Sequence, residues 1–435
     1  MVKETELEIL WRQIGRAGSV NAYVQQQMTE LGYVVERRDA ANMSKSELDK
    51  YKKELKQEAE QKRKLGAEAW KAYKQHHIVH VGEGIFWNDA DDWDKWDIDN
   101  AEERAAENGL PPLSTPADLA EALKISVAQL RWFCYHRDAA KMIHYQRFTI
   151  PKRNGKEREI WAPTAQLKEI QHWILYNILE RLLVHEAAHG FVPGRSIVTN
   201  AAVHTNSRLI VKMDLQDFFP TITFRRIKGL FRHAGYREQI ATLLALLCSE
   251  SPREEVILRG QKYLVALSPR CLPQGAPTSP AITNAICLRL DRRMTGLTSK
   301  LGWRYSRYAD DLTFSITKAK ASEFYGLKKF FHDIHFVVEA EGFVINEEKT
   351  RVMRSGGRQK VTGLIVNGTQ PPRVPRVLRR RLRAVVHNLE QGKELHEGDF
   401  LQHHIGHAAM LYSTNPEEGK RYLDCLRDVA ESTNA

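Results

Sequence analysis

The 435 residues are 42% hydrophobic and 27% charged with a net charge of +11, and a chain of this length predicts two or three domains. The longest apolar run, Ile240 to Cys248, is too short to span a bilayer, and the first residues carry acids where a signal peptide needs bases. Five cysteines without a Cys-x-x-Cys pair argue against a disulfide framework or a zinc knuckle. We therefore expect a soluble cytoplasmic protein with no membrane partner.

Charge is unevenly distributed along the chain. Residues 1–130 carry 18 basic and 24 acidic side chains, whereas residues 131–435 carry 47 and 30. A basic body behind an acidic leader predicts that the body binds a polyanion, with a merely basic soluble protein as the alternative. Within the leader, residues 5–75 are expected to be helical. The stretch 44–74, rich in Lys, Glu, Gln and Ala, predicts a helix that is either a solvated face or a partner-binding helix.

Residues 85–100 interleave three Trp with six Asp but lack the Gly and the terminal Glu of a calcium loop. We expect the Trp side chains to pin an irregular segment to the body, with the acids neutralising part of its basic surface. Prolines between 111 and 116 indicate a linker, and Ser114 or Thr115 is expected to cap a helix that carries Leu119 and Leu130. This pattern places a domain boundary near residue 115.

From residue 145 the pattern mixes hairpins with long helices, which predicts the α+β class. An Asn154-Gly155 turn joins the first two strands. Strands are expected at 145–151, 157–162, 209–213, 351–354 and 360–366, with a further hairpin over 303–316. Helices are expected at 167–184, 227–234, 237–248, 280–295 and 321–341, followed by an Arg-rich helical region to the end.

Two acidic motifs indicate chemistry. The strand 209–213 leads into Asp214, and Asp310 and Asp311 lie at a hairpin turn within Tyr-Ala-Asp-Asp. An isolated Asp-Asp pair is usually structural because Asp favours turns, but a second strand that ends in Asp favours a functional interpretation. Three carboxylates can hold two Mg²⁺ ions, one to lower the pKa of an attacking hydroxyl and one to neutralise a leaving pyrophosphate. In-line nucleotidyl transfer needs that arrangement.

Other stretches supply what such a reaction still needs. The Gly/Pro loop 272–280 opens a helix and can bring Gln274 against a nucleotide or template strand, although alone it is an ordinary turn. Lys152 and Arg158 flank the first hairpin and can grip a triphosphate, with plain surface exposure as the alternative. Phe219 can pack below the sugar and exclude a 2′-hydroxyl, although a buried strand Phe is the commoner role.

In this order the Arg158 region, the Asp214 strand, the Pro-Gln-Gly loop, the Tyr-Ala-Asp-Asp hairpin and Asn346-Glu-Glu-Lys349-Thr resemble a reverse transcriptase. Asn200-Ala-Ala-Val-His204 and Val361-Thr362-Gly363 are similar to the Asn-Ala-x-x-His and Val-Thr-Gly elements of retron reverse transcriptases. The resemblance implies a right-hand polymerase fold with a helical N-terminal extension. The implied parts are the extension (1–114), the fingers (115–208), the palm with finger insertions (209–366) and an α-helical thumb (367–435).

The resemblance also implies roles for individual residues. The implied catalytic, metal-binding carboxylates are Asp214, Asp310 and Asp311, with Leu215 at the same site and two Mg²⁺ ions, replaceable by Mn²⁺, as the cofactor. The implied nucleotide-binding residues are Lys152, Arg158, Asp217, Phe218, Phe219, Gln274, Gly275 and Lys349, of which Lys349 is a candidate proton donor to pyrophosphate. The implied RNA-binding residues are Asn200, His204, Val361, Thr362, Gly363, Arg376 and Arg380.

The implied function is RNA-directed DNA synthesis on a cognate structured non-coding RNA. Priming from an internal guanosine 2′-hydroxyl would give branched, RNA-linked multicopy single-stranded DNA with a role in anti-phage defence. The implied partners are that RNA, its DNA product and dNTPs, together with an effector protein and a higher-order assembly. A group II intron-like or other bacterial reverse transcriptase without a dedicated RNA is the alternative enzyme. A binding module with vestigial carboxylates is disfavoured because all three Asp are present. We expect the acidic leader to pack on the polymerase, bind a protein or shield basic surface rather than to hold nucleic acid.

Overall fold

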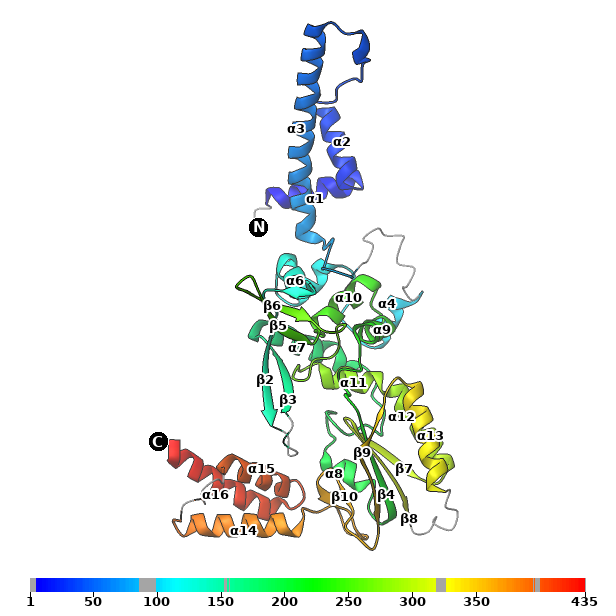
Figure 1. Cartoon of the computed structure of the whole chain (residues 1–435), viewed down its shortest axis with the longest axis vertical. Helices are drawn as coiled ribbons and strands as arrows, with labels where there is room; N and C mark the ends of the chain where they lie inside the picture. The colour runs from blue at the N-terminus through cyan, green and yellow to red at the C-terminus, as the bar shows by residue number, and fades with distance from the viewer. Residues whose placement is uncertain are drawn as a thin grey trace. The chain divides into compact units, whose positions relative to one another are not determined.

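The computed structural model describes residues 5–85, 99–151, 155, 157–317, 326–393, 395 and 400–434. The chain divides into two compact units, one made of Met1–Tyr145, Thr164–Trp173 and Phe231–Ser268, the other of Gln146–Pro163, Ile174–Leu230 and Pro269–Ala435. Each unit mixes helices with strands, so the predicted α+β class is confirmed (Figure 1). Most of the predicted Trp/Asp segment, together with Lys152 and Asn154, lies outside the described residues. The division into extension, fingers, palm and thumb stays a prediction.

The first unit begins with three helices, α1 (Glu6–Ala17), α2 (Val20–Glu30) and α3 (Lys45–His76), which pack on one another (Figure 1, blue). A short 3₁₀ turn, η1 (Ala40–Asn42), precedes α3. The long helix begins at Ser44, whose hydroxyl accepts a hydrogen bond from the Glu47 N–H while the Glu47 carboxylate accepts one from the Ser44 N–H. Ile14, Met28 and Ala69 belong to the shared core of the three helices. The predicted long helix is therefore confirmed.

The rest of this unit includes several short helices and a three-stranded sheet. The helices are α4 (Ala101–Glu107), α5 (Pro116–Ala122), α6 (Val127–Cys134) and α10 (Glu238–Leu247). The strand order is β1 (Ala139–Ala140), β6 (Gln261–Ala266) and β5 (Arg253–Leu258). Thr115 caps α5 as predicted, but the single helix expected after it is two, because Ser126 caps α6 separately. The β5–β6 hairpin was not predicted, since its exposed run Val256–Leu258 lacks the alternation of polar and apolar residues that indicates a strand.

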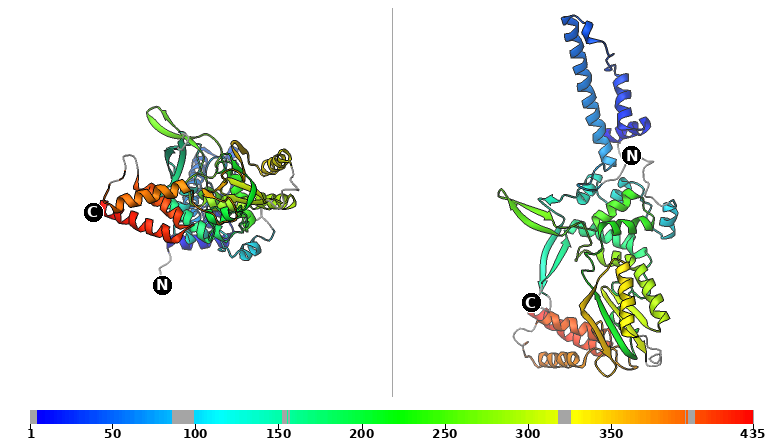
Figure 2. Two further views of the ribbon diagram at one scale, coloured as in Figure 1. Left: turned by 90° about the horizontal axis from the view of Figure 1, so that it is seen from below. Right: turned by 45° about the vertical axis from the view of Figure 1, so that its right-hand side comes forward.

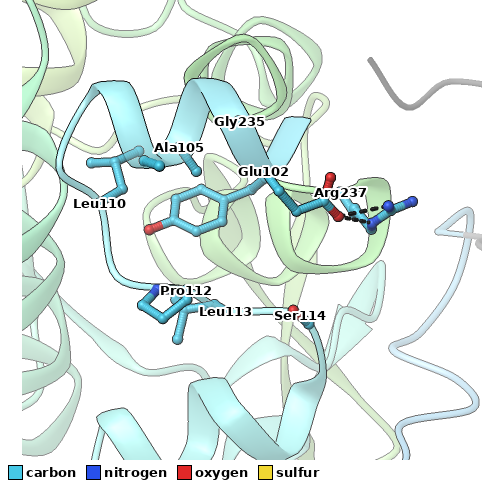
Figure 3. A pocket seen from close by; sticks show the side chains of 10 residues that line it. Glu102, Ala105, Leu110, Pro112, Leu113, Ser114, Gly235 and Arg237 are labelled. Carbon is cyan, nitrogen blue, oxygen red and sulfur yellow. Dashed lines mark hydrogen bonds and ion pairs between the residues drawn. The ribbon is translucent and has the colours of Figure 1, made fainter. Parts of the chain in front are cut away.

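The segment around α4 is held against the start of α10 by close backbone contact. Gly235 has a φ of +120°, and a Cβ there would lie 2.4 Å from the backbone nitrogen of Ala105, so only glycine fits. The Tyr236 hydroxyl donates to the Pro111 carbonyl at 3.2 Å. A small pocket remains between these segments, and the ion pair of Glu102 with Arg237 lies at its edge (Figure 3). The predicted linker is thus packed against its own unit.

The second unit is built on a four-stranded antiparallel sheet. Its strand order is β7 (Arg304–Tyr308), β8 (Asp311–Thr317), β4 (Ser207–Leu215) and β9 (Ile345–Arg354). The hairpin of β2 (Tyr145–Pro151) and β3 (Glu157–Pro163) and the short pair β10 (Lys360–Val361) and β11 (Leu364–Ile365) form two further sheets. These strands lie where strands were predicted, but β9 is longer than expected and the single strand expected at 360–366 is two, β10 and β11.

The two faces of the four-stranded sheet are covered by different elements. On one face α13 (Leu327–Ala340) places Phe330 against Phe314 of β8, with ring centroids 5.5 Å apart, and α12 (Leu288–Lys300) packs beside it (Figure 1). On the other face Ile210 of β4 joins a core shared with α8 (Ile197–Ala202) and three C-terminal helices. Those helices, α14 (Arg376–Glu390), α15 (Leu401–Tyr412) and α16 (Pro416–Asn434), form a bundle (Figure 2).

The remaining elements are α7 (Ala165–Asn177), the 3₁₀ turn η2 (Leu179–Arg181), α9 (Phe224–Ala234) and α11 (Ser279–Ile286). Two predicted helices are therefore interrupted: 167–184 ends early and continues as η2, and 280–295 is split into α11 and α12. Across the described ranges, no helix combines the length and apolar composition that a bilayer crossing requires.

Candidate active site

Three carboxylates meet at one end of the four-stranded sheet. Asp214 of β4 and Asp311 of β8 are direct cross-strand partners, so their side chains leave the sheet on the same face. Asp310 lies in the turn before β8, and its carbonyl accepts a hydrogen bond from the Leu215 N–H at 3.0 Å. The structure therefore brings together the four residues that the sequence placed at a metal site.

The carboxylates repel one another. Burial and then the charges of Asp214 and Asp311 raise the pKa of Asp310 from 3.8 to about 6. Asp214 is only 8% exposed. Close carboxylates in a partly buried site need a cation to offset their charge. The arrangement of these three carboxylates therefore favours the binding of a cation.

Two lysines face the carboxylates. Lys349 of β9 donates to Asp214 Oδ1 at 2.7 Å, and Lys212 of β4 donates to Asp311 Oδ2 at 3.1 Å. Burial alone would lower the pKa of Lys349, but its hydrogen bond to Asp214 and the nearby carboxylates raise it above the ordinary value. Sequence reasoning missed Lys212, although its two-residue spacing from Asp214 on one strand indicates the same face of the sheet.

The donor set suits a divalent metal ion. Carboxylate oxygens are the hard ligands that Mg²⁺ and Mn²⁺ prefer. Among the described residues, no three His, Cys, Asp or Glu side chains are already arranged to hold an ion, and two of the three carboxylates instead pair with lysines. A bound cation would compete with Lys349 and Lys212 for the same oxygens. The residues present therefore fit a divalent cation whose binding displaces lysine contacts.

A fully buried ion pair supports the turn that carries Asp310. Arg307 of β7 donates from Nε and Nη2 to the two oxygens of Asp291 on α12, at 2.9 and 2.7 Å, and neither side chain is exposed. The Arg307 Nη1 donates to the Ala309 carbonyl at 3.2 Å and to Asn284 Oδ1 at 3.0 Å. Arg307 therefore fixes the backbone one residue before Asp310. Its position two residues before the turn gave no sign of this partner.

The loop of residues 185–195, which precedes α8, lies along β7, the strand that carries Arg307. The Arg307 N–H donates to the Ala187 carbonyl, and the His189 N–H donates to the Arg307 carbonyl, both at 2.7 Å. Arg195 holds the loop by donating to the carbonyls of three of its residues, His185, Glu186 and Ala188. The loop then reaches the turn at Gly190, where a Cβ would lie 2.7 Å from the backbone nitrogen of Ala309.

The contact at Gly190 makes a prediction about activity. Gly190→Ala pushes the Tyr308-Ala309 backbone, so we expect the rate of DNA synthesis to fall by about 10- to 100-fold, the scale of a misplacement of up to 1 Å. Gly296→Ala is the matched control, because a Cβ there meets nothing within 4 Å and alanine favours the helix. Nucleotide incorporation on a short primed RNA template measures both variants. Equal rates for the two would show that this contact does not position the turn.

The predicted sugar-contacting segment follows β4. Asp217 is exposed with a φ of +43°. Phe218 is buried against Phe343, with ring centroids 5.5 Å apart, whereas Phe219 is half-buried. Phe219, five residues after Asp214, is thus the more accessible of the two rings. This exposure suits the role at the sugar that the sequence assigned to it.

The Pro-Gln-Gly loop lies against the β2–β3 hairpin. The Trp161 N–H donates to the Gln274 carbonyl at 2.8 Å. Gly275 has a φ of +132°, and a Cβ there would lie 2.8 Å from Ile160 Cγ2. Arg158 is exposed on β3, while Lys152 lies outside the described residues. The structure thus joins the loop to the strand that carries Arg158, two features widely separated along the chain.

Asn200 and His204 do not lie where the sequence interpretation put them. Both side chains are fully buried. The Ser306 hydroxyl donates to Asn200 Oδ1 at 2.6 Å, so it accepts from His204 Nε2, and the Ser315 hydroxyl then donates to His204 Nδ1. Buried side chains with these partners cannot touch RNA, and the expected direct contact is corrected. They join the α8 region to β7 and β8, the strands of the Tyr-Ala-Asp-Asp hairpin.

Burial of His204 makes stability depend on pH. Burial, with the nearby cations Arg304 and Lys212, holds the pKa of His204 well below its ordinary value of 6.5. In the unfolded chain the His204 imidazole binds a proton at a pH at which the folded chain keeps it neutral. The free energy of unfolding therefore decreases as pH falls below 6.5. We expect His204→Gln to reduce the slope of the free energy of unfolding against pH, below pH 6.5, by up to about 1.4 kcal/mol per pH unit. Amide hydrogen exchange in β4 and β8 measures it, and an unchanged slope would contradict the assignment.

The remaining predicted RNA-binding residues are divided between interior and surface. Val361 is buried, and the Thr362 hydroxyl donates to the Ile197 carbonyl of α8 at 2.9 Å. Gly363 has a φ of +90° and lies against Met410. In contrast, Arg376 and Arg380 are exposed one turn apart on α14. Only the two arginines present charge that can reach a phosphate.

Comparisons with known proteins place the chain in one family. A family model described as Reverse transcriptase (RNA-dependent DNA polymerase) matches residues 150–396. The chain is 46% identical to the Retron Mx162 reverse transcriptase of Myxococcus xanthus, over 97% of this chain and 89% of that one. It is 43% identical to the Retron Mx65 reverse transcriptase of the same organism, over 74% and 73%. It is 31% identical to the Retron Ec86 reverse transcriptase of Escherichia coli, over 72% and 89%.

Proposed function

The chain belongs to the reverse transcriptases, and within them to the retron reverse transcriptases; it is an RNA-directed DNA polymerase that takes an RNA template, and we propose that its template is one cognate structured non-coding RNA. We propose further that synthesis starts from the 2′-hydroxyl of an internal guanosine of that RNA. The product is then a single-stranded DNA branched from its own template, made in many copies. The role proposed for it is anti-phage defence, together with an effector protein and within a larger assembly.

Members of this family depend on a divalent metal, and the proposed cofactor is two Mg²⁺ ions, with Mn²⁺ as a substitute. Asp214, Asp310 and Asp311, with the backbone of Leu215, would hold them. When bound, the metal lowers the pKa of the attacking hydroxyl and offsets the charge of the leaving pyrophosphate. The raised pKa of Asp310, which burial and then the charges of Asp214 and Asp311 cause, supports this assignment.

The proposed roles of the two lysines follow from their contacts and their exposure. Lys349 is an ammonium group held at Asp214, 59% exposed, so it can turn toward solvent when a cation takes its oxygen. Its proton is then available to the leaving pyrophosphate, as the sequence suggested. Lys212 is less exposed, at 23%, and we propose that it keeps Asp311 oriented.

The proposed nucleotide site uses residues around the carboxylates. Asp217, Phe218 and Phe219 lie directly after β4, and the half-buried Phe219 ring would meet the sugar. Arg158 on β3 would contact phosphate, next to Gln274 and Gly275, which would face the base pair. The backbone hydrogen bond from Trp161 to Gln274 supports this grouping, because it couples the loop to the strand of Arg158.

Recognition of RNA is proposed for the exposed arginines of α14. Arg379 pairs with Glu418 of α16 at 2.6 Å, which holds the helices together. Arg376 and Arg380 form no ion pair among the described residues, so both side chains are available to contact RNA phosphates. Val361 lies in the core that also holds α14 and would support this surface from within, whereas Asn200 and His204 would support the Tyr-Ala-Asp-Asp hairpin. The five cysteines are free thiols, which favours a reducing compartment such as the cytoplasm.

One observation carries the proposal: three mutually repelling carboxylates lie on adjacent strands in a chain that belongs to the retron reverse transcriptases. The test is to purify the protein with its co-transcribed RNA, add dNTPs and Mg²⁺, and look for DNA that stays attached to RNA. An RNA with 2′-deoxyguanosine at the branch position is expected to give no attached DNA. Attached DNA from that RNA would contradict 2′-hydroxyl priming, and DNA never attached to RNA would favour a reverse transcriptase without a dedicated RNA.

A further inference from the structure

Helix α3 has a line of cations on the side that faces away from its partners. It packs on α1 and α2 through the side that includes Ala69 and Ala72. Lys45, Lys52, Lys56, Arg63 and Lys74 follow one another at intervals of 7, 4, 7 and 11 residues, each close to a whole number of helical turns. All five are exposed. We call these five residues the basic stripe, and Lys53, Lys64 and Lys71 lie along one edge of it.

Three of the six acids of α3 are used away from the stripe. Glu47 caps the start of the helix. Glu54 pairs with Arg38 at 3.0 Å, and Glu58 pairs with Arg37 at 2.6 Å, on the side away from the stripe. Within the described ranges, no member of the basic stripe forms an ion pair or a side-chain hydrogen bond, so its charge is directed to solvent. Asp49 and Glu60 are also exposed on this side, one turn after Lys45 and Lys56, so two acids face the five cations of the stripe and the three at its edge, and the side stays strongly basic.

The shape of the stripe limits its partner to a long polyanion. It covers about 44 Å, at 1.5 Å per residue. A membrane surface does not fit, because an interfacial helix needs an exposed apolar face and the apolar face of α3 is taken by α1 and α2. A single strand needs aromatic side chains for base stacking, and among the described residues of α3 only Trp70 offers an exposed ring beside the stripe. Duplex RNA is recognised through phosphates and shape, which a row of cations provides.

We propose that the basic stripe of α3 is a docking surface for the phosphate backbone of a base-paired stem of the RNA that the enzyme copies. The inference rests on the proposed function only in naming the cognate RNA as the source of that stem. It departs from the expectation that the leader holds no nucleic acid. The negative average of the leader comes largely from residues 86–98, which carry five Asp, whereas α3 carries ten basic and six acidic side chains.

The test compares two charge-reversal variants of the full-length protein. Lys56→Glu with Arg63→Glu reverses two charges of the stripe, and Lys50→Glu with Lys62→Glu reverses two exposed charges of the same helix outside it. The probe is a blunt-ended RNA duplex of about 16 base pairs, the span of a duplex-binding module. We expect the stripe variant to raise the dissociation constant by about 10-fold or more and to lower the salt slope of log K by about 2. The control variant is expected to leave both nearly unchanged.

Three further measurements separate this inference from the polymerase site. Asp310→Asn is expected to keep duplex binding while it loses synthesis, and the stripe variant is expected to keep extension of a short primed template. Circular dichroism compares the total helical content of the two charge variants with that of the unchanged protein, and we expect no difference. Equal binding by the two charge variants would overturn the proposal. The proposal would also be overturned if the stripe variant lost binding only to vesicles of anionic lipid or only to a co-purifying acidic protein. Either result would assign the stripe to another partner.

Discussion

Asp310→Asn is expected to lower DNA synthesis by about 10³-fold or more and, at the same time, to stabilise the metal-free protein. The loss follows because a charge-stabilising group of the reaction is removed from a preorganised site. The gain follows from the pKa of Asp310, which burial and the other carboxylates raise to about 6. The folded state holds this proton to higher pH than the unfolded chain, so ionisation destabilises the fold as pH rises from about 4 through 6, and asparagine avoids that cost.

Two measurements check this prediction. Incorporation of dNTPs on a short primed template gives the rate, and denaturant unfolding in the presence of a chelator gives the stability, expected to rise by about 1–3 kcal/mol above pH 6. Asp424→Asn is the matched control, because Asp424 is exposed on α16 far along the chain from the site. Undiminished synthesis by Asp310→Asn would remove the carboxylates from the mechanism. A loss of stability would show that the substitution acts through the fold.

The second large effect is expected at the buried ion pair. Asp291→Asn leaves the Arg307 guanidinium charged and without its carboxylate in a site with no solvent exposure. We expect a loss of about 3–5 kcal/mol in the free energy of unfolding. The exposed pair of Arg421 with Glu390 is the control, and Arg421→Ala is expected to cost less than about 1 kcal/mol. Denaturant unfolding followed by circular dichroism compares the two.

A double variant separates the structural role of this pair from its positioning role. Arg307→Met with Asp291→Leu removes both buried charges, and such replacements are often neutral or stabilising, so much of the lost stability is expected to return. Synthesis is expected to stay low, because the hydrogen bond from Arg307 to the Ala309 carbonyl is absent and the turn before Asp310 loses its support. Recovery of both stability and synthesis would show that Arg307 serves the fold alone.

The chemistry of this protein was largely predictable from local pattern. An apolar strand that ends in Asp214 and a hairpin with Asp310 and Asp311 at its turn are each defined by a few consecutive residues. Alternation along β4 and β8 then puts Asp214 and Asp311 on one face, provided that the strands pair, and the structure pairs them directly. The relatives agree with the family that these motifs indicated.

Local sequence pattern does not predict the burial of a residue that is covered by an element distant in the sequence. Asn200 and His204 read as available polar groups, but both are buried, and Ser306 and Ser315 of the hairpin form hydrogen bonds with them. The same limit explains why the helices expected at 167–184 and 280–295 are interrupted, and why the β5–β6 hairpin was not predicted. Pairing and packing between distant segments overrule the local preference of a stretch of chain in each case.

By itself, then, the sequence determined the order of the motifs, the carboxylates and the family, because each depends on neighbouring residues. The tertiary structure decided which lysine meets which carboxylate, which side chains are buried, and which side of α3 is free. Those properties depend on contacts between residues about a hundred positions apart, such as Lys212 and Asp311, or on which side of a helix its partners cover. The net charge of the leader is a sum over both sides of α3, and only packing shows that one side is basic and open.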